Sequence, residues 1–427
     1  MRGNTSSRTP NNHCFVLLLL LRFCNPIQLL SSPYRNNLCT ESKSIDNSKE
    51  KQIDNGGKQF GWDSNYSYKS VCLVDGKPTV VDGFDCRYQI AVGRYKNAIN
   101  MTGWSFLEVE TKSEAEPEMQ AYAAGILEGT LTRHTLELHL MNVVYDYCTD
   151  YQTYCDKLKL YLKQNLEYVQ ERLAKAPADD PYWQGVKRVY LQMTGVWHGF
   201  SGAPFDVSID FSLNPILMLN SRGELFELEL KFNRSKGRRD EATGGGRCSG
   251  LVKQNGYFAS YNIPFFEKIS RISEFEQKGH EFEWFSWKNC PRGKIFARDQ
   301  HNVVDMDSLT KLMRYNDYTH DPFSHCKCSP PFTAEAAIST RGDLNPANGT
   351  YEISAMGHAN HAAFDYKGTG YKLFNKLQFR AWSGPTYGKV PVFDWRTSDL
   401  APTVKHYGHP LRWEFLPVEY EWETILN

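Results

Sequence analysis

A cysteine that follows a glycine-rich run is the strongest candidate for chemistry in this sequence. The run GGGR ends at Arg247, Cys248 comes next, and the apolar pair Leu251 and Val252 follows closely. Glycine lets the backbone before Cys248 adopt strained conformations, in which the thiol can attack the carbonyl carbon of Arg247. Water then opens the resulting thioester, so the chain is cut and Cys248 becomes a new N-terminus.

Such a cut would give Cys248 its own base. A free α-amino group has a reference pKa of about 7.7 to 8.0, so near neutral pH it can accept the proton of the neighbouring thiol. This is the layout of an N-terminal-nucleophile hydrolase precursor. The alternative is that Cys248 is a buried structural cysteine, and the local pattern taken alone favours that alternative.

A second segment resembles a catalytic motif only in part. Residues 198–203, HGFSGA, approach the Gly-x-Ser-x-Gly elbow of serine hydrolases. Ala203 replaces the second glycine, however, and Pro204 disturbs the helix that the elbow must feed. We therefore interpret this segment as a loop.

A zinc site is a further alternative that the spacing does not favour. Four residues could be counted together as ligands: His320, His325, Cys326 and Cys328. The Cys-x-Cys spacing differs from the usual knuckle, and a disulfide between these cysteines is equally compatible with an oxidising compartment. We expect no metal and no cofactor.

The first residues predict export. Arg2 and Arg8 precede the apolar run CFVLLLLL at 14–21, and small residues follow at Ser31 and Ser32, which is typical of a signal peptide over residues 1–32. The run is too short to span a bilayer, so no transmembrane anchor is expected. Residues 33–66 are polar and predict a flexible mature N-terminus.

Cysteines and sequons favour the same secreted or lysosomal location. Nine of the eleven cysteines lie beyond residue 32, and an odd number leaves one thiol unpaired. Four Asn-x-Ser/Thr sequons predict glycans on surface loops. They begin at Asn65, Asn100, Asn233 and Asn348.

Composition indicates a large folded protein without a charged partner. The 427 residues suggest two or three domains, or one large one. Lys+Arg and Asp+Glu both number 49, and this zero net charge argues against binding to nucleic acid or to an anionic membrane. A hydrophobic fraction of 41% and a mean hydropathy of -0.54 exclude disordered, collagenous and membrane chains.

Periodicity predicts strands first and helices next. Asp75-Gly76 lies between apolar residues in 71–81 and predicts a hairpin, and residues 106–110 predict a strand. Apolar residues spaced by three or four over 158–173 predict a helix. Another helix is expected to begin at Asp180-Pro181 and to end at Gly195.

Later segments read as a hairpin and a loop. Apolar and charged residues alternate within 217–232, and this period of two predicts a hairpin with one buried face. The basic, glycine-rich residues 233–247 predict an exposed flexible loop.

Seven blocks of the sequence resemble the phospholipase B-like family of lysosomal and secreted N-terminal-nucleophile proteins. The resemblance covers most of residues 68–423, and the run DLNPANG is its most specific part. The blocks are EPEMQAYAAGILEGTLTR (116–133), GRCSGLVK (246–253), ASYNIPFFEK (259–268), LMRYNDYTHDPF (312–323), ISTRGDLNPANGTYE (338–352), SGPTY (383–387) and HYGHPLRWEFLPVE (406–419).

The resemblance implies an α+β fold, an αββα sandwich in the intact family, with helices between 116 and 197 packed on one side. It implies that Cys248 is the nucleophile and Arg247 the last residue of an N-terminal fragment, 67–247, followed by a C-terminal fragment, 248–427. The substrate would be a lipid or other N-acyl compound with an amide or ester bond.

Disulfide pairs are also implied by the resemblance. We expect one bond between Cys148 and Cys155, and one between Cys326 and Cys328. Four of the five other cysteines beyond the signal peptide could then pair among themselves and leave Cys248 as the odd thiol. Those four are Cys39, Cys72, Cys86 and Cys290.

The chain departs from the family pattern at two places. Only Gln254 to Phe258 separate two of the blocks, where the family has a long stretch with an Asn-Thr-Trp type motif expected to help bind the oxyanion. Ala362 and Ala363 stand where the family tends to have two glycines. We therefore expect an incomplete sandwich and a poor catalyst.

Three residues in or near the family blocks are candidates to complete a working site. They are Asn316, Arg341 and His361. The rival hypothesis is a secreted glycoprotein without catalysis that acts by binding.

Overall fold

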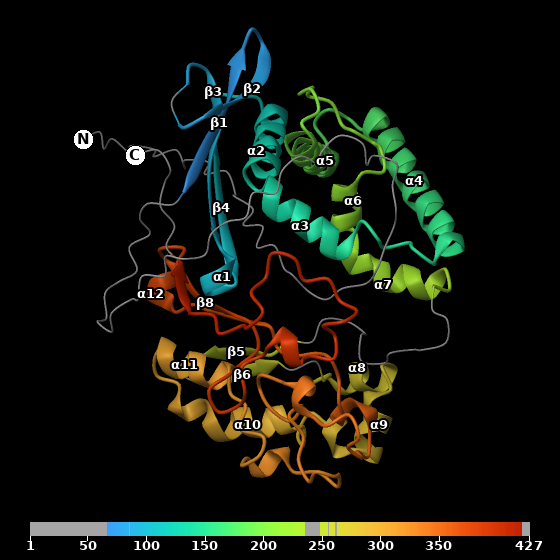
Figure 1. Ribbon diagram of the computed structural model, residues 1–427, viewed down its shortest axis with the longest axis vertical. Helices are drawn as coiled ribbons and strands as arrows, with labels where there is room; N and C mark the ends of the chain where they lie inside the picture. The colour runs from blue at the N-terminus through green and yellow to red at the C-terminus, as the bar shows by residue number, and fades with distance from the viewer. Residues whose placement is uncertain (1–65, 85, 235–247, 255, 261–262, 421–427) are drawn as a thin grey trace, which may run out of the picture. The chain divides into compact units, whose positions relative to one another are not determined.

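The computed structural model describes residues 66–84, 86–234, 248–254, 256–260 and 263–420, and it confirms the α+β class (Figure 1). The chain divides into two compact units. Of the described residues, those of 66–96 and 106–234 belong to unit 1, and those of 97–105 and 248–420 belong to unit 2. The predicted signal peptide, the predicted N-terminus 33–66 apart from Tyr66, and residues 235–247 of the predicted loop 233–247 lie outside the described residues. Arg234, near the start of that loop, is buried and not exposed as predicted. The fragment boundary before Cys248 stays a prediction.

Unit 1 begins with an antiparallel hairpin on which the rest of its sheet is built. Asp75 and Gly76 both have positive φ, 48° and 73°, which is the backbone of the tight hairpin turn that this residue pair favours. The predicted hairpin and the predicted strand at 106–110 are therefore confirmed. The strand order is β2-β1-β3-β4, with β1 at Ser67–Val74, β2 at Lys77–Asp82, β3 at Gln89–Ala98 and β4 at Trp104–Thr111.

Two long helices, α2 (Pro117–Leu131) and α5 (Pro181–Ser201), pack with this sheet. Ile90 and Ala91 of the sheet share one buried cluster with residues of both helices, and Figure 1 shows α2 beside the strands. The helical residues of that cluster are Tyr122, Ala123, Ile126, Leu127 and Leu191. Burial of these apolar side chains is the main stabilising contribution of the contact.

Helices α2 and α5 approach so closely that the glycines at their contact leave no room for side chains. A Cβ atom on Gly195 would lie 2.2 Å from the carbonyl oxygen of Tyr122, and one on Gly129 would lie 2.1 Å from the carbonyl oxygen of Val196. The prediction that α5 ends at Gly195 is wrong because this glycine serves the helix contact. The helix ends at Gly202, whose φ of 77° is the left-handed cap that glycine favours.

The interpretation of the segment HGFSGA as a loop is also wrong. Its first four residues form the last turn of α5 rather than a loop, and Gly202 caps them. The start of the helix is as predicted, since the side chain of Asp180 accepts hydrogen bonds from the backbone of Tyr182 and Trp183.

The other helices of unit 1 include one confirmed prediction and one error. The long helix predicted over 158–173 is α4, and its buried stripe contains Leu158, Leu162 and Leu166. The predicted hairpin within 217–232 is wrong, because this segment forms the helices α6 and α7. The bounds are α3 Arg133–Val143, α4 Gln152–Lys175, α6 Pro215–Asn220 and α7 Arg222–Lys231.

Unit 2 contains two small sheets and short helices among loops. The strands β5 (Gly250–Lys253) and β6 (Tyr257–Ser260) pair antiparallel, and a second sheet has the order β7-β8-β9. The bounds of the remaining helices and strands of unit 2 are α1 Ile99–Thr102, α8 Glu267–Ile272, α9 Phe275–Glu281, α10 Pro291–Asp299, α11 Met306–Met313, β7 Asp365–Gly368, α12 Tyr371–Phe374, β8 Phe379–Ser383 and β9 Val418–Tyr420. The αββα sandwich stays a proposal.

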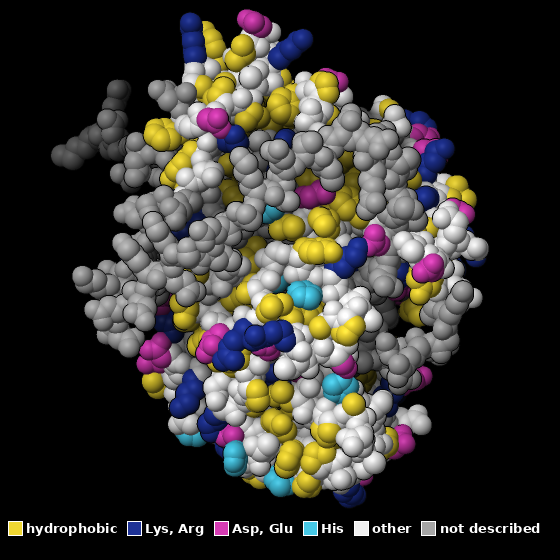
Figure 2. Space-filling view, viewed as in Figure 1, with side chains coloured by type: hydrophobic (Ala, Val, Ile, Leu, Met, Phe, Trp, Pro, Cys, Tyr) yellow, Lys and Arg dark blue, Asp and Glu magenta, His cyan; other side chains and the backbone are white. Residues whose placement is uncertain are grey.

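The β5–β6 pair has one apolar face in solvent. Val252 lies opposite Phe258, and their side chains are 67% and 63% exposed. Apolar side chains, in yellow, are also visible on the face of unit 2 shown in Figure 2. The opposite face is packed, because Leu251 and Ala259 contact the core cluster that contains Ile338.

Helix composition bears on the predicted absence of an anchor. Over the described part of the chain, no helix combines the length and the apolar character needed to cross a bilayer.

Candidate functional site around Cys248

Cys248 lies exposed, two residues before β5. The hydroxyl of the next residue, Ser249, donates to the carbonyl oxygen of Ile338 at 3.5 Å and accepts from Arg292 at 3.2 Å. The alternative that Cys248 is a buried structural cysteine is therefore wrong. Cys290 has that role, since its thiol is buried in the core of unit 2.

Asn316 supports the loop that passes the start of β5. Its side-chain amide group donates to the carbonyl oxygens of Ala334 at 3.1 Å and Ser339 at 2.8 Å, and its oxygen accepts from the backbone of Tyr318. Asn316 is 4% exposed. Both amide hydrogens are thus used to hold backbone, which is a structural role.

Arg341 is also a buried structural residue. Its guanidinium forms a two-bond ion pair with Asp343 and donates to the carbonyl oxygens of Thr386 and Pro391. A second buried arginine, Arg314, lies near enough to respond to this charge. Burial, together with the smaller effect of the Arg341 charge, lowers the pKa of Arg314 to about 10, although Tyr387 acts in the opposite direction.

His361 pairs with a carboxylate that the sequence analysis missed. Its Nδ1 atom lies 3.3 Å from Oε1 of Glu335, which is 4% exposed. Gly342 lies against both, since a Cβ on it would fall 2.2 Å from Glu335 Oε1. The signal in the sequence was a single acid within the small apolar run AEAAI, a pattern that indicates a buried carboxylate.

One loop brings these candidates together. Ser249 contacts Ile338, and Asn316 binds the carbonyl group of the next residue. The backbone of Arg341 donates to the carbonyl oxygen of Ala334, which Asn316 also binds. Arg341 in turn forms a β-bridge with Ala362, next to His361. The residues 334–341 therefore connect the start of β5 with all three predicted supporting residues.

The predicted disulfides are present. Cys148 is bonded to Cys155 and Cys326 to Cys328, and a third bond joins Cys72 to Cys86. Because Cys326 and Cys328 are bonded to each other, the zinc alternative is wrong. Cys39 lies outside the described residues.

Predicted modification and cleavage positions are only partly described. Three sequon asparagines have exposed side chains, as glycan attachment requires: Asn100, Asn233 and Asn348. The fourth, Asn65, and the predicted cleavage residue Arg247 lie outside the described residues.

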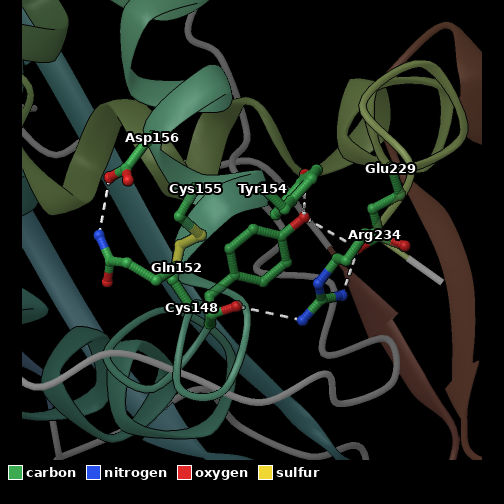
Figure 3. Close-up of a disulfide and its surroundings, with 8 residues drawn as sticks. Cys148, Gln152, Tyr154, Cys155, Asp156, Glu229 and Arg234 are labelled. Carbon is green, nitrogen blue, oxygen red and sulfur yellow. Dashed lines mark hydrogen bonds and ion pairs between the residues drawn. A yellow bond between two sulfur atoms is a disulfide. The ribbon is translucent and has the colours of Figure 1, made fainter. Parts of the chain in front are cut away.

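Arg234 is the last residue of unit 1, and Figure 3 labels its side chain near that of Glu229. Its guanidinium lies over the rings of Tyr147, at 4.3 Å, and Tyr151, at 4.5 Å, and it forms an ion pair with Glu229. It also donates to the carbonyl oxygen of Tyr147. The disulfide Cys148–Cys155 adjoins this cluster, so the chain is tightly held up to Arg234.

The fold and the site together define a class, namely α+β proteins with an exposed cysteine just before the start of a strand. A sequence profile described as Phospholipase B matches residues 91–255 and 248–420. The phospholipase B-like 2 protein of Caenorhabditis elegans is 36% identical over 531 aligned positions, which cover 86% of this chain and 91% of that protein. The chain belongs to the phospholipase B family.

Two other relatives extend the comparison. The phospholipase B-like 3 protein of Caenorhabditis elegans is 30% identical, with 84% of this chain and 91% of that protein covered. The phospholipase B-like 2 protein of Homo sapiens is 28% identical, with 82% and 88% covered.

The alignments also bear on the predicted missing segment. The first alignment runs over 531 positions, more than the 427 residues of this chain, so that relative has residues without a counterpart here. The two profile matches meet at 248–255. This position agrees with the predicted gap after Lys253.

Proposed function

We propose that this protein is an N-terminal-nucleophile hydrolase that cleaves amide or ester bonds of lipids in a secreted or lysosomal setting, with Cys248 as nucleophile. The observation that carries the proposal is the exposed position of Cys248 two residues before β5, within the region that matches the family. A nucleophile must be reachable by substrate, and a strand anchored in the core fixes its direction.

The chemistry requires a cut between Arg247 and Cys248. The released α-amine then accepts the thiol proton, and the thiolate attacks the acyl carbon of the lipid. The amine or alcohol leaves with that proton, and the acyl group remains as a thioester. Water, deprotonated by the same α-amine, hydrolyses the thioester and restores the thiol.

The experiment begins with purified precursor incubated at acid pH with protease inhibitors. We expect a new N-terminus at Cys248, formed at a first-order rate that does not depend on protein concentration. Cys248→Ala should abolish the cut, and Cys290→Ala, which alters the buried thiol, should retain it. A start at Asp240 that persists in Cys248→Ala would instead indicate a protease acting after Arg238 and Arg239.

A second candidate function is a glycoprotein that binds without catalysis. The use of both Asn316 amide hydrogens for backbone carbonyls favours it, because a donor already engaged cannot serve a developing oxyanion. Loss of one oxyanion donor typically costs about 2.7 to 4 kcal/mol of transition-state stabilisation.

A panel of N-acyl amides and phospholipids separates the two candidates. The binding hypothesis predicts that cut protein and Cys248→Ala show the same background turnover. Turnover that depends on Cys248 and approaches that of the longer Caenorhabditis elegans relative would refute the binding hypothesis.

A further inference from the structure

We propose that the disulfide Cys326–Cys328 is a surface site of reversible thiol–disulfide exchange with small anionic thiols. This proposal is independent of the hydrolase activity. It rests on the access to the bond, on the charge beside it, and on the backbone that holds the two cysteines.

Access distinguishes this bond from the other disulfide with a short loop. Cys326 and Cys328 are both partly exposed and lie within a surface turn. Cys148 and Cys155 are 4% and 0% exposed, and Figure 3 shows their bond packed beside tyrosine side chains. An attacking thiolate must reach one sulfur atom in line with the bond, so Cys326–Cys328 should react in the folded protein where Cys148–Cys155 is shielded.

Positive charge lies between the two cysteines. The side chain of Lys327 is 89% exposed, and its ammonium is 3.7 Å from a carboxylate oxygen of Glu352. A nearby ammonium stabilises the thiolate that leaves when the disulfide opens, and it attracts an anionic attacking thiol. Glu352 weakens this attraction but leaves the ammonium in solvent.

Backbone hydrogen bonds keep the turn in place when the disulfide opens. Thr333 donates to the carbonyl oxygen of Ser324, and Cys326 donates to that of Pro331. Farther along, Ser329 and Thr350 exchange two backbone hydrogen bonds of 2.9 Å. The thiols therefore stay close together, which makes closure of the bond an intramolecular and fast step.

The exchange balances in two steps. A small thiolate attacks one cysteine sulfur, the Cys326–Cys328 bond breaks, and the electron pair leaves on the other sulfur, which takes a proton. A second small thiolate then attacks the mixed disulfide and releases the first cysteine as a thiol. The protein disulfide is reduced by two electrons, and two small thiols are oxidised to their disulfide.

The test is differential alkylation of the full chain after equilibration with increasing glutathione, read by mass spectrometry. We expect Cys326 and Cys328 to be alkylated at a glutathione concentration at least about tenfold below that needed for Cys148 and Cys155. Replacing reduced glutathione by glutathione disulfide should restore the bond, because the two protein thiols then reduce that disulfide to two glutathione molecules. Opening of all these cysteines together, and only when circular dichroism reports unfolding, would overturn the proposal.

A charge variant tests the preference for anionic thiols. Lys327→Glu should slow opening by glutathione about threefold more than opening by neutral 2-mercaptoethanol, since attraction becomes repulsion at short range in screened water. Lys268→Glu, an exposed lysine on α8, is the matched control and should change neither rate. Equal slowing of both thiols by Lys327→Glu would overturn the proposed charge preference.

Discussion

Substitution of Gly195 by alanine tests whether the α2–α5 contact limits the stability of unit 1. The new Cβ atom would lie 2.2 Å from the carbonyl oxygen of Tyr122 and 2.9 Å from the backbone nitrogen of Ile126. Both neighbours are backbone atoms, so the helices themselves must move apart by about 1 Å to reach an ordinary C···O separation.

Two effects of opposite sign decide how much Gly195→Ala changes the free energy of unfolding. Alanine is a better helix former than glycine by about 0.8 to 1.0 kcal/mol. Overpacking typically costs about 1 to 3 kcal/mol, and the upper end applies here because no flexible side chain can yield. We therefore expect Gly195→Ala to lower the free energy of unfolding by about 2 kcal/mol, which corresponds to a fall in Tm of about 4 to 8 °C.

Gly185→Ala is the matched control in the same helix. A Cβ at Gly185 would meet no atom within 4 Å, so only the helix preference acts and stability should rise by up to about 1 kcal/mol. Urea titration followed by far-ultraviolet circular dichroism measures both variants. If Gly195→Ala unfolds at or above the wild-type midpoint, the reasoning about backbone contact is refuted.

Three further predictions follow from described contacts. Asn316→Ala should lower the free energy of unfolding by about 2 to 4 kcal/mol in a urea titration, because buried backbone groups lose partners, whereas exposed Asn360→Ala should stay within about 0.5 kcal/mol. Burial raises the pKa of Glu128 to about 7, although a hydrogen bond from Gln192 acts to lower it. Protonated Glu128 therefore contributes fully to the free energy of unfolding below pH 4.5, and this contribution is lost as pH rises through 7. Glu128→Gln should remove this slope, on the order of 3 kcal/mol, and an unchanged slope in pH-dependent urea titrations would assign it to another group. Because Val252 is exposed on β5, we expect the wild-type chain to self-associate with rising concentration in analytical ultracentrifugation. Val252→Lys should reduce that association without lowering the urea midpoint, and unchanged association would place the contact elsewhere.

The sequence correctly predicted the turns and caps that a few neighbouring residues specify without any partner elsewhere in the chain. The Asp75-Gly76 turn and the Asp180-Pro181 cap each specify their own backbone, and both are present. Gly195 was misread because a glycine at a close helix contact has the same sequence signature as a helix end. Only the partner helix distinguishes the two, and the partner cannot be read from the local pattern.

The error at 217–232 has a different cause. Leucine, glutamate and lysine alternate there, but all three are strong helix formers, whereas strands favour β-branched and aromatic residues. Leu225, Leu228 and Phe232 recur at helical spacing and pack against the cluster around Cys155. The Asn214-Pro215 pair, which caps α6 as Asp180-Pro181 caps α5, was the available signal.

The residues that the family blocks suggested for the site contact one loop, residues 334–341, and their catalytic roles stay predictions. Asn316 binds the carbonyl oxygens of Ala334 and Ser339, and Ala362, next to His361, forms a β-bridge with Arg341. Their hydrogen-bonding partners depend on residues distant in the chain, such as Thr386 for Arg341, and no spacing rule predicts these. Glu335 was missed for the same reason.

The cluster around Arg234 has a consequence for the fate of the N-terminal fragment. A cut before Cys248 would leave residues 235–247 as a tail beyond this packed arginine. Carboxypeptidases of an acidic compartment could shorten such a tail without touching the core. They would slow at Arg234, whose removal breaks an ion pair with Glu229 and contacts with three tyrosine rings. Mature preparations would then contain N-terminal fragments whose C-terminal ends vary between Arg234 and Arg247.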